Sequence, residues 1–141
     1  MRFNQDRLRR VVIADDHPTV LAAFVRLLKP FCEVVATVSC GHDAVDAVIR
    51  LKPDVLVVDL MMPDFDGLEV CRRVKKAVPA THIVIVTSFA DAQVQALALC
   101  EGAVAFVPKQ QGADTLVSTI QQIFASMPGD ASMPGDPARI E

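Results

Sequence analysis

Residues 55–69 read VLVVDLMMPDFDGLE, an apolar run that ends in an acid and leads into a turn. The run Val55–Val58 is rich in β-branched residues and does not alternate apolar with polar positions, which is typical of a strand buried on both faces of a parallel sheet. Four further short apolar runs are Val11–Ala14, Val34–Val38, Ile83–Val86 and Val104–Val107. Five buried strands are therefore predicted, and Asp59 stands at the carboxyl end of the third.

Segments with helical spacing of their apolar residues separate these runs. Four apolar stripes are made by Val20, Leu21, Phe24, Leu27 and Leu28; by Ala44, Val45, Val48 and Leu51; by Leu68, Cys71, Val74 and Val78; and by Ala113, Leu116, Val117, Ile120, Ile123 and Phe124. The segment Asp91–Glu101 is also predicted to be helical, although it is apolar almost all round. Asp91 and Asp114 at helix starts, and Gly102 just past a helix end, support these assignments.

Strand and helix thus alternate five times along the chain. Because crossovers between parallel strands are right-handed, this alternation predicts a doubly wound α/β fold with one five-stranded parallel sheet and helices on both of its faces. In such sheets the binding crevice lies beyond the carboxyl ends of the strands.

Composition limits the class of protein further. The chain has 141 residues, of which 52% are apolar, enough for one domain with a sizeable core. The net charge is -3, and Trp and Tyr are absent. Neither a basic surface for a phosphate backbone nor an aromatic platform for single-stranded nucleic acid is indicated, so we expect no direct nucleic-acid contact.

The compartment and the domain limits are also expectations. Four cysteines, which lack metal-ligand spacing, indicate a reducing compartment: Cys32, Cys40, Cys71 and Cys100. With no signal-peptide pattern and no apolar stretch of the ~20 residues that a membrane span needs, we expect a cytoplasmic protein without membrane contact. We predict an N-terminal arm over 1–8, a domain over 9–125, and a flexible tail over 126–141, because Ala125–Asp130 and Ala131–Asp136 repeat the hexapeptide ASMPGD.

Polar residues stand at the carboxyl ends of four predicted strands. Asp15 and Asp16 follow the first strand, Asp59 the third, Thr87 the fourth, and Lys109 the fifth. Taken singly, each has an ordinary explanation as a helix cap, a turn residue, a strand residue or a loop lysine. Their joint placement at one edge of the sheet favours a common site.

The chemistry of such a site follows from its charges. Neighbouring carboxylates repel one another, and a hard divalent cation such as Mg²⁺ relieves the repulsion through oxygen ligands. A carboxylate can also act as a nucleophile that forms an aspartyl phosphate. The lysine ammonium would then offset the charge of the phosphoryl group, and a threonine hydroxyl could donate to one of its oxygens.

The motifs resemble those of response-regulator receiver domains. The matching segments are Ile13–Pro18, Val57–Glu69, Ile83–Ser88 and Gly102–Lys109, and the resemblance covers about residues 9–125. The Asp-Asp-His-Pro form at the first strand looks most like the NarL/FixJ/LuxR-type branch, whose members carry a DNA-binding output. The resemblance implies a flavodoxin-like, CheY-like fold with strand order 2-1-3-4-5.

The same resemblance implies a role for each site residue. Asp59 would accept a phosphoryl group from a histidine kinase or phosphotransfer protein, and Lys109 would pair with the phosphoryl oxygens. Asp15, Asp16, Asp59 and the backbone carbonyl of Met61 would bind Mg²⁺. Thr87 and Phe106 would form the switch.

Two departures from the family pattern involve three positions. Asp64 replaces the glycine common after the loop proline, and we expect the turn to survive because Asp tolerates turn conformations. Met61 and Phe89 are bulky and apolar, and the resemblance implies that their positions control access of water to the phosphoaspartate. Our hypothesis is that they slow hydrolysis of the phosphoryl group, so a Met61→Asn, Phe89→Glu double variant should hold it more briefly.

The output of the switch is less determined. The apolar Asp91–Glu101 helix, as part of a face over residues 91–125, could form a homodimer or bind an output partner, or could be an ordinary well-covered helix. The chain is expected to be a phosphoacceptor and not an enzyme. Alternatives are a degenerate receiver that acts without phosphorylation, or a fragment of a DNA-binding transcriptional regulator.

Other classes fit less well. A cobalamin-binding pattern would need a glycine where Val20 stands, and an aspartyl phosphatase would need a second acid where Met61 stands. A dinucleotide site would need a Gly-rich loop after the first strand.

Overall fold

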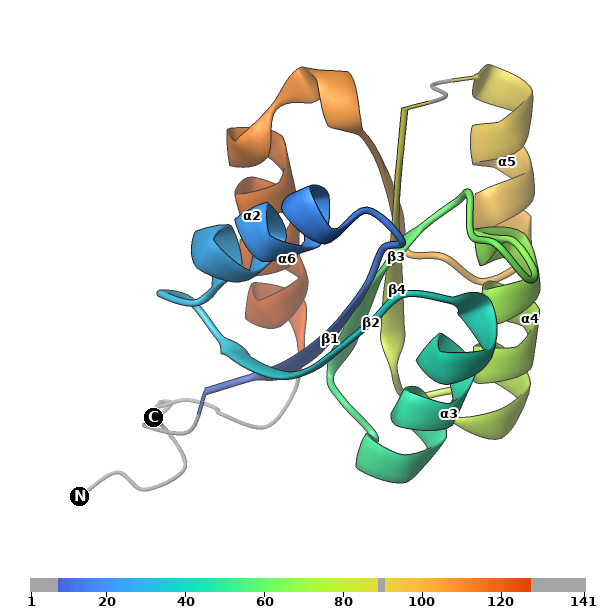
Figure 1. The fold of residues 1–141 in the computed structure, drawn as a ribbon, viewed down its shortest axis with the longest axis horizontal. Coiled ribbons are helices and arrows are strands. Elements are labelled where there is room, and N and C mark those ends of the chain that lie inside the picture. Colours follow the sequence, from blue (N-terminus) through green and yellow to red (C-terminus); the bar gives the residue numbers. More distant parts are fainter. Residues whose placement is uncertain (1–7, 89–90, 128–141) are drawn as a thin grey trace.

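A five-stranded parallel sheet forms the centre of the molecule (Figure 1). The computed structural model describes residues 8–88 and 91–127. The strand order is β2-β1-β3-β4-β5, which confirms the predicted order. The strands are β1 (Arg10–Ala14), β2 (Glu33–Val38), β3 (Val55–Asp59), β4 (His82–Thr87) and β5 (Ala105–Pro108).

Helices cover both faces of the sheet, as the alternating pattern predicted. The helices are α2 (Pro18–Leu28), α3 (Gly41–Leu51), α4 (Gly67–Ala77), α5 (Ala92–Cys100) and α6 (Ala113–Ser126), with a short 3-10 helix η1 (Lys109–Gln111). In Figure 1, α2 and α6 lie on one side of the sheet and α3, α4 and α5 on the other.

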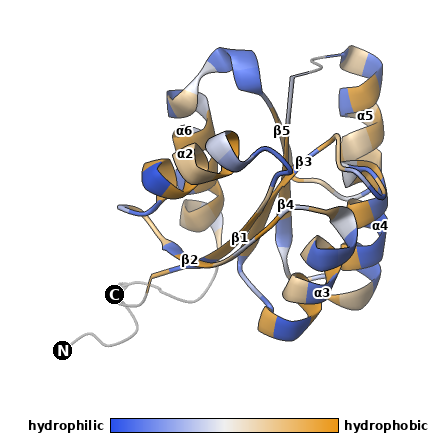
Figure 2. Cartoon of the chain, viewed as in Figure 1, coloured by the Kyte–Doolittle hydropathy of each residue, from blue (hydrophilic) through white to orange (hydrophobic). Residues whose placement is uncertain are grey.

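The unbroken apolar runs are explained by two cores, one on each face of the sheet. Successive side chains of a strand point to opposite faces. In β4, Ile83 and Ile85 pack with α3 and α4 residues, whereas Val84 and Val86 pack with α2 and α6 residues. The apolar residues on both faces of the central strands therefore meet an apolar layer, and Figure 2 shows these strands mainly in apolar colours.

The ends of several elements differ from the sequence-based expectation. β5 starts at Ala105, one residue late, and Val104 is exposed. α6 is preceded by Gly112, whose positive φ of 88° suits glycine, so Asp114 lies within the first turn and is not the cap. α6 also continues through Ser126, because Ala125 and Ser126 extend its last turn.

The predicted arm and tail are only partly described. Residue 8 is present, and residues 1–7 lie outside the described residues, as does the second copy of the hexapeptide at 131–136. Met127 ends α6 and packs against the α2–α6 core. Within residues 8–88 and 91–127, no helix combines the length and the apolar character needed to cross a bilayer.

Candidate functional site

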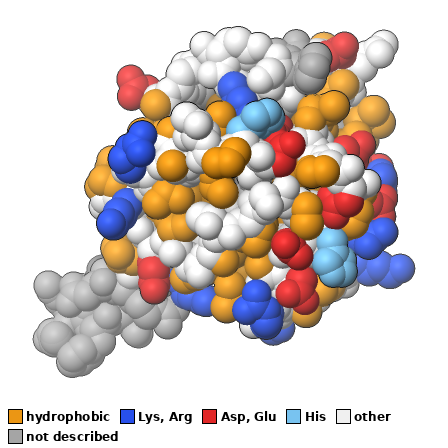
Figure 3. Space-filling model, in the orientation of Figure 1, with side chains coloured by type: hydrophobic (Ala, Val, Ile, Leu, Met, Phe, Trp, Pro, Cys, Tyr) orange, Lys and Arg blue, Asp and Glu red, His pale blue; other side chains and the backbone are white. Residues whose placement is uncertain are grey.

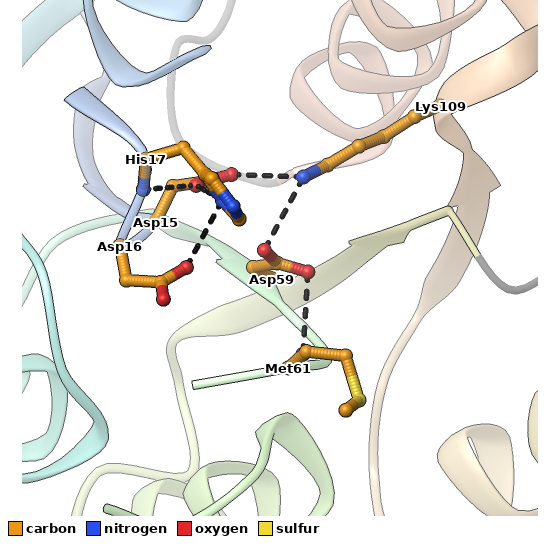
Figure 4. Close-up of polar contacts among 6 residues, drawn as sticks. All are labelled: Asp15, Asp16, His17, Asp59, Met61 and Lys109. Carbon is orange, nitrogen blue, oxygen red and sulfur yellow. Dashed lines mark hydrogen bonds and ion pairs between the residues drawn. The ribbon is translucent and has the colours of Figure 1, made fainter. Parts of the chain in front are cut away.

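The predicted polar residues converge at the carboxyl edge of the sheet. Asp15 follows β1 directly, Asp59 is the last residue of β3, Thr87 is the last residue of β4, and Lys109 follows β5. Since β1, β3, β4 and β5 are consecutive neighbours in the sheet, their ends are adjacent in space. Figure 4 shows the acidic and lysine side chains pointing toward one another.

Lys109 joins two buried carboxylates. Its Nζ lies 3.1 Å from Asp15 Oδ2 and 3.2 Å from Asp59 Oδ2, and it donates a hydrogen bond to each. Asp15 is 1% exposed and Asp59 is 4% exposed, whereas the Lys109 side chain is 19% exposed. Buried charges of this kind are stable only when they are paired and hydrogen-bonded, so the lysine holds the two acids in one site.

The environment changes the acidity of these groups. Burial raises the pKa of Asp59 above its ordinary value, and the Lys109 charge and the Met61 N–H only partly oppose that effect. Burial lowers the pKa of Lys109, but its hydrogen bond to Asp15 and the charge of Asp59 outweigh this and leave the pKa raised. Lys109 is therefore a cation at neutral pH. A further positive charge nearby would stabilise the ionised form of Asp59.

The donor set fits a hard divalent cation. Ligand atoms of Asp15, Asp16, His17 and Asp59 all lie within 4.8 Å of one another. Among the residues that the structure describes, Asp16 Oδ1 is buried and accepts no hydrogen bond, and the His17 Nδ1 atom 3.1 Å away forms an ion pair with it only when the imidazole is protonated. A buried carboxylate oxygen without a hydrogen bond is costly, and a metal ion would satisfy it. Met61 lies at the site through its backbone, where its N–H donates to Asp59 Oδ1 at 3.2 Å.

His17 is a member of this cluster that sequence reasoning missed. Its Nδ1 lies 3.3 Å from Asp15 Oδ1 and 3.1 Å from Asp16 Oδ1, and its backbone N–H donates to Asp15 Oδ1 at 2.9 Å. His17 also occupies the N-cap position of α2, so neither acid is the N-cap residue of that helix. Its place directly after the two acids was the available signal. Figure 3 shows histidine, acidic and basic side chains close together in the upper part of this face.

The two predicted switch residues lie on the same side of the sheet. Thr87 is fully buried and follows Ile85 by two positions on the face covered by α3, α4 and α5. Phe106 is the register partner of Ile85 in β5 and packs, half-buried, against the same core. Thr87 thus stands between the acidic site and the β5 region. Phe89, predicted to shield the site, lies outside the described residues, and Met61 is exposed.

A doubly wound parallel sheet with three acids and a lysine at its carboxyl edge defines a class of α/β signalling domain. Residues 11–121 match the family described as "Response regulator receiver domain". The chain belongs to this family, which confirms the resemblance seen in the sequence.

Three similar proteins illustrate the family. The response regulator GacA of Pseudomonas aeruginosa is 31% identical over 118 residues, which cover 82% of this chain and 55% of that protein. A protein-glutamate methylesterase/protein-glutamine glutaminase of Thermotoga maritima is 34% identical over 127 residues, or 84% and 35% of the two chains. A crystal structure of a LuxR-family DNA-binding response regulator from Staphylococcus aureus has a TM-score of 0.78 and 30% identity, and the match covers 82% and 98%.

The first of these relatives shows how far the match extends. The chain spans about half the length of GacA. Members of the family therefore occur joined to further segments, and one similar protein is named as an enzyme. The family match defines this chain as a receiver domain of two-component signalling and leaves its output to be proposed.

Proposed function

We propose that Asp59 is the phosphoacceptor of this receiver domain and takes its phosphoryl group from a histidine kinase or a phosphotransfer protein. The observation that carries the proposal is the buried contact of Lys109 with both Asp59 and Asp15. A carboxylate next to a fixed ammonium can approach a phosphoryl group that would otherwise be repelled.

In the proposed reaction an Asp59 carboxylate oxygen attacks phosphorus. The new O–P bond replaces the P–N bond of the donor phosphohistidine, and the donor imidazole leaves. Lys109 stays protonated and compensates the charge on the phosphoryl oxygens. Mg²⁺, held by Asp15, Asp16, Asp59 and the Met61 carbonyl, would supply further positive charge against the same oxygens.

The switch is proposed to run from Thr87 to Phe106. A phosphoryl group offers the Thr87 hydroxyl a new acceptor and adds about -1.5 to -2 charge. A move of Thr87 toward Asp59 would leave space on the sheet face covered by α3, α4 and α5, and Phe106 on the same face could rotate into that space. A bias of ~1.4 kcal/mol already changes a two-state population tenfold, so one or two hydrogen bonds are sufficient.

The surface that would respond includes α5 and β5. Leu97, Leu99 and Val104 are 51%, 46% and 44% exposed, so α5 and the segment before β5 offer apolar side chains to a partner. We propose that this surface, within the 91–125 face, forms the contact with a second copy of the chain in the phosphorylated state.

The output of the whole protein is a further proposal. The similarity to a LuxR-family DNA-binding regulator supports a role as the receiver of a transcriptional regulator, in which this chain itself makes no nucleic-acid contact. The absence of an enzymatic activity of its own, and a cytoplasmic location, stay predictions.

Intact mass spectrometry tests the central proposal. After incubation with acetyl phosphate and Mg²⁺, the wild type should gain about 80 Da, the mass of one phosphoryl group. Asp59→Ala should gain nothing, while Asp91→Ala, which changes an acid outside the site, should react as the wild type does. A wild type that gains no mass would favour the degenerate-receiver alternative, and an Asp59→Ala variant that gains it would show that another residue is the phosphoacceptor.

A further inference from the structure

The start of α3 is bound by a side chain from a distant loop. Backbone N–H groups of Gly41 and His42 donate to Oδ1 and Oδ2 of Asp64, at 2.7 and 2.8 Å. The first N–H groups of a helix have no partner within the helix, and a negative charge there also interacts favourably with the helix dipole. Asp64 therefore caps α3 from 23 residues away.

The local cap of α3 is weak by comparison. Cys40 occupies the N-cap position, and its Sγ accepts from the Asp43 N–H at 3.5 Å. A thiol sulfur is a poor acceptor. Desolvation acts to raise the pKa of Asp64, but the N–H groups of His42, Gly41 and Phe65 outweigh it and lower the pKa to about 2. Asp64 is thus a full negative charge at the helix start at neutral pH.

Phe65 fixes the tip of the same loop by packing. A Cβ atom at Gly41 would lie 2.8 Å from Phe65 Cδ2, so only glycine allows the ring to lie this close to α3. The Arg73 guanidinium of α4 lies over the same ring, 4.3 Å from its centre. The loop tip is therefore held between two helices.

The base of the loop is closed next to the acidic site. Gly67 N donates to Leu60 O at 2.8 Å, and Met61 N donates to Asp59 Oδ1 at 3.2 Å. Residues 60–66 thus form a short loop with its base and its tip both anchored, and Met61 lies between the two anchors.

We propose that Asp64 is a positioning residue that holds the 60–66 loop against the start of α3, and so sets the affinity of the acidic site for Mg²⁺ through Met61. The inference rests on the proposed function, in which the Met61 carbonyl is a metal ligand. A loop fixed in advance does not have to be ordered when the ion binds, and partners that orient a metal ligand commonly change metal affinity by about 10–100-fold when removed.

Calorimetric titration with MgCl₂ tests the inference. Asp64→Ala should raise the dissociation constant about tenfold. Asp64→Asn, which keeps one acceptor oxygen, should fall between that variant and the wild type. The matched control is Asp91→Ala, because Asp91 also accepts from two N–H groups at a helix start, those of Gln93 and Val94 at 2.7 and 3.4 Å. This control should leave the affinity for Mg²⁺ unchanged.

Amide hydrogen exchange without metal gives a second, independent readout. Exchange at Met61 should be faster in Asp64→Ala than in the wild type and unaffected by Asp91→Ala. If neither Mg²⁺ affinity nor Met61 exchange changes in Asp64→Ala, or if both aspartate variants change them equally, the inference is overturned while phosphorylation of Asp59 can still stand. If the wild type binds no Mg²⁺, the metal role fails, and the exchange data alone decide whether Asp64 orders the loop.

Discussion

The carboxyl edge of the sheet and helix α5 differ in which side chains they bury. The sheet edge buries charged groups, whereas α5 exposes apolar ones. At the sheet edge, the charged groups of Asp15 and Asp59 are buried and paired by Lys109. On α5, Leu97 and Leu99 are about half exposed. Burial of the charged groups costs desolvation energy, and the exposed leucines add little to the stability of an isolated domain. Packing of the domain requires neither the buried acidic site nor the exposed apolar residues of α5. The proposed function explains both, the first as the phosphorylation site and the second as a contact surface.

The contrast between α4 and α5 sharpens this comparison. Both helices lie on the same side of the sheet, but α4 buries Val70, Cys71 and Val74 and carries ion pairs on its outer side. In α5 only Ala98 is buried. Figure 2 shows α4 with a hydrophilic side and α5 apolar along most of its length. Packing alone therefore explains α4 and does not explain α5.

The largest effect is expected from removing the cation of the buried site. Lys109→Met leaves two buried carboxylates without their common partner, and should lower the free energy of unfolding by about 3 kcal/mol in metal-free buffer. Urea denaturation at neutral pH measures this. Added Mg²⁺ should restore part of the loss. A loss as small as that of an exposed ion pair would show that the site is better solvated than its burial indicates.

A smaller effect of opposite sign is expected from Asp59→Asn. Burial and the neighbouring Asp15 raise the pKa of Asp59, so its ionised form destabilises the fold at neutral pH. The neutral amide should raise the free energy of unfolding by about 1 kcal/mol, because an unfavourable buried charge is removed while Lys109 keeps Asp15. Asp16→Asn, at a side chain that is 32% exposed, is the matched comparison and should change less. A lower free energy of unfolding in Asp59→Asn would contradict the claim that the ionised Asp59 carboxylate destabilises the fold.

The α5 surface should tolerate polar substitution. Leu97→Gln with Leu99→Gln should change the free energy of unfolding by less than about 0.5 kcal/mol, because both side chains are half exposed and helix propensity is nearly kept. Val74→Ala in α4 is the buried control and should cost about 2 kcal/mol. Sedimentation of the phosphorylated protein should show a dimer in the wild type and a monomer in the double glutamine variant. A wild type that stays monomeric would remove the proposed use of this surface.

The smallest effect concerns the 60–66 loop, and it is a change in the free energy of unfolding at acid pH. The pKa of Asp64 is lowered from 3.8 to about 2, so the folded state binds this proton less tightly than the unfolded chain does. Its stabilisation is present above the ordinary pKa and is lost as the pH falls toward 2. The stability difference between wild type and Asp64→Asn should therefore narrow over this range. A difference that stays constant would show that the carboxylate charge does not stabilise the α3 start.

Sequence reasoning succeeded where the signal is local. Buried parallel strands appear as continuous apolar runs, and residues directly after such runs must lie at one edge of the sheet. For this reason Asp15, Asp59, Thr87 and Lys109 could be placed together in advance. The Asp91 cap was also predicted from its position, and Asp91 Oδ1 does accept from the N–H groups of Gln93 and Val94.

Two kinds of contact could be found only in the tertiary structure. One joins segments far apart in the chain, and the other joins near neighbours whose backbone conformation the sequence did not indicate. Asp64 was read as an ordinary turn residue, because nothing in its neighbourhood indicates a helix start 23 residues earlier. The contact of His17 with Asp15 and Asp16 could be seen only in the folded chain, because it depends on how the backbone enters α2. By itself, the sequence determined which segments form buried strands, because the apolar run of each strand consists of residues next to one another in the chain. Only the folded chain decided which loop caps which helix, because the partners of a helix start are chosen by packing in three dimensions.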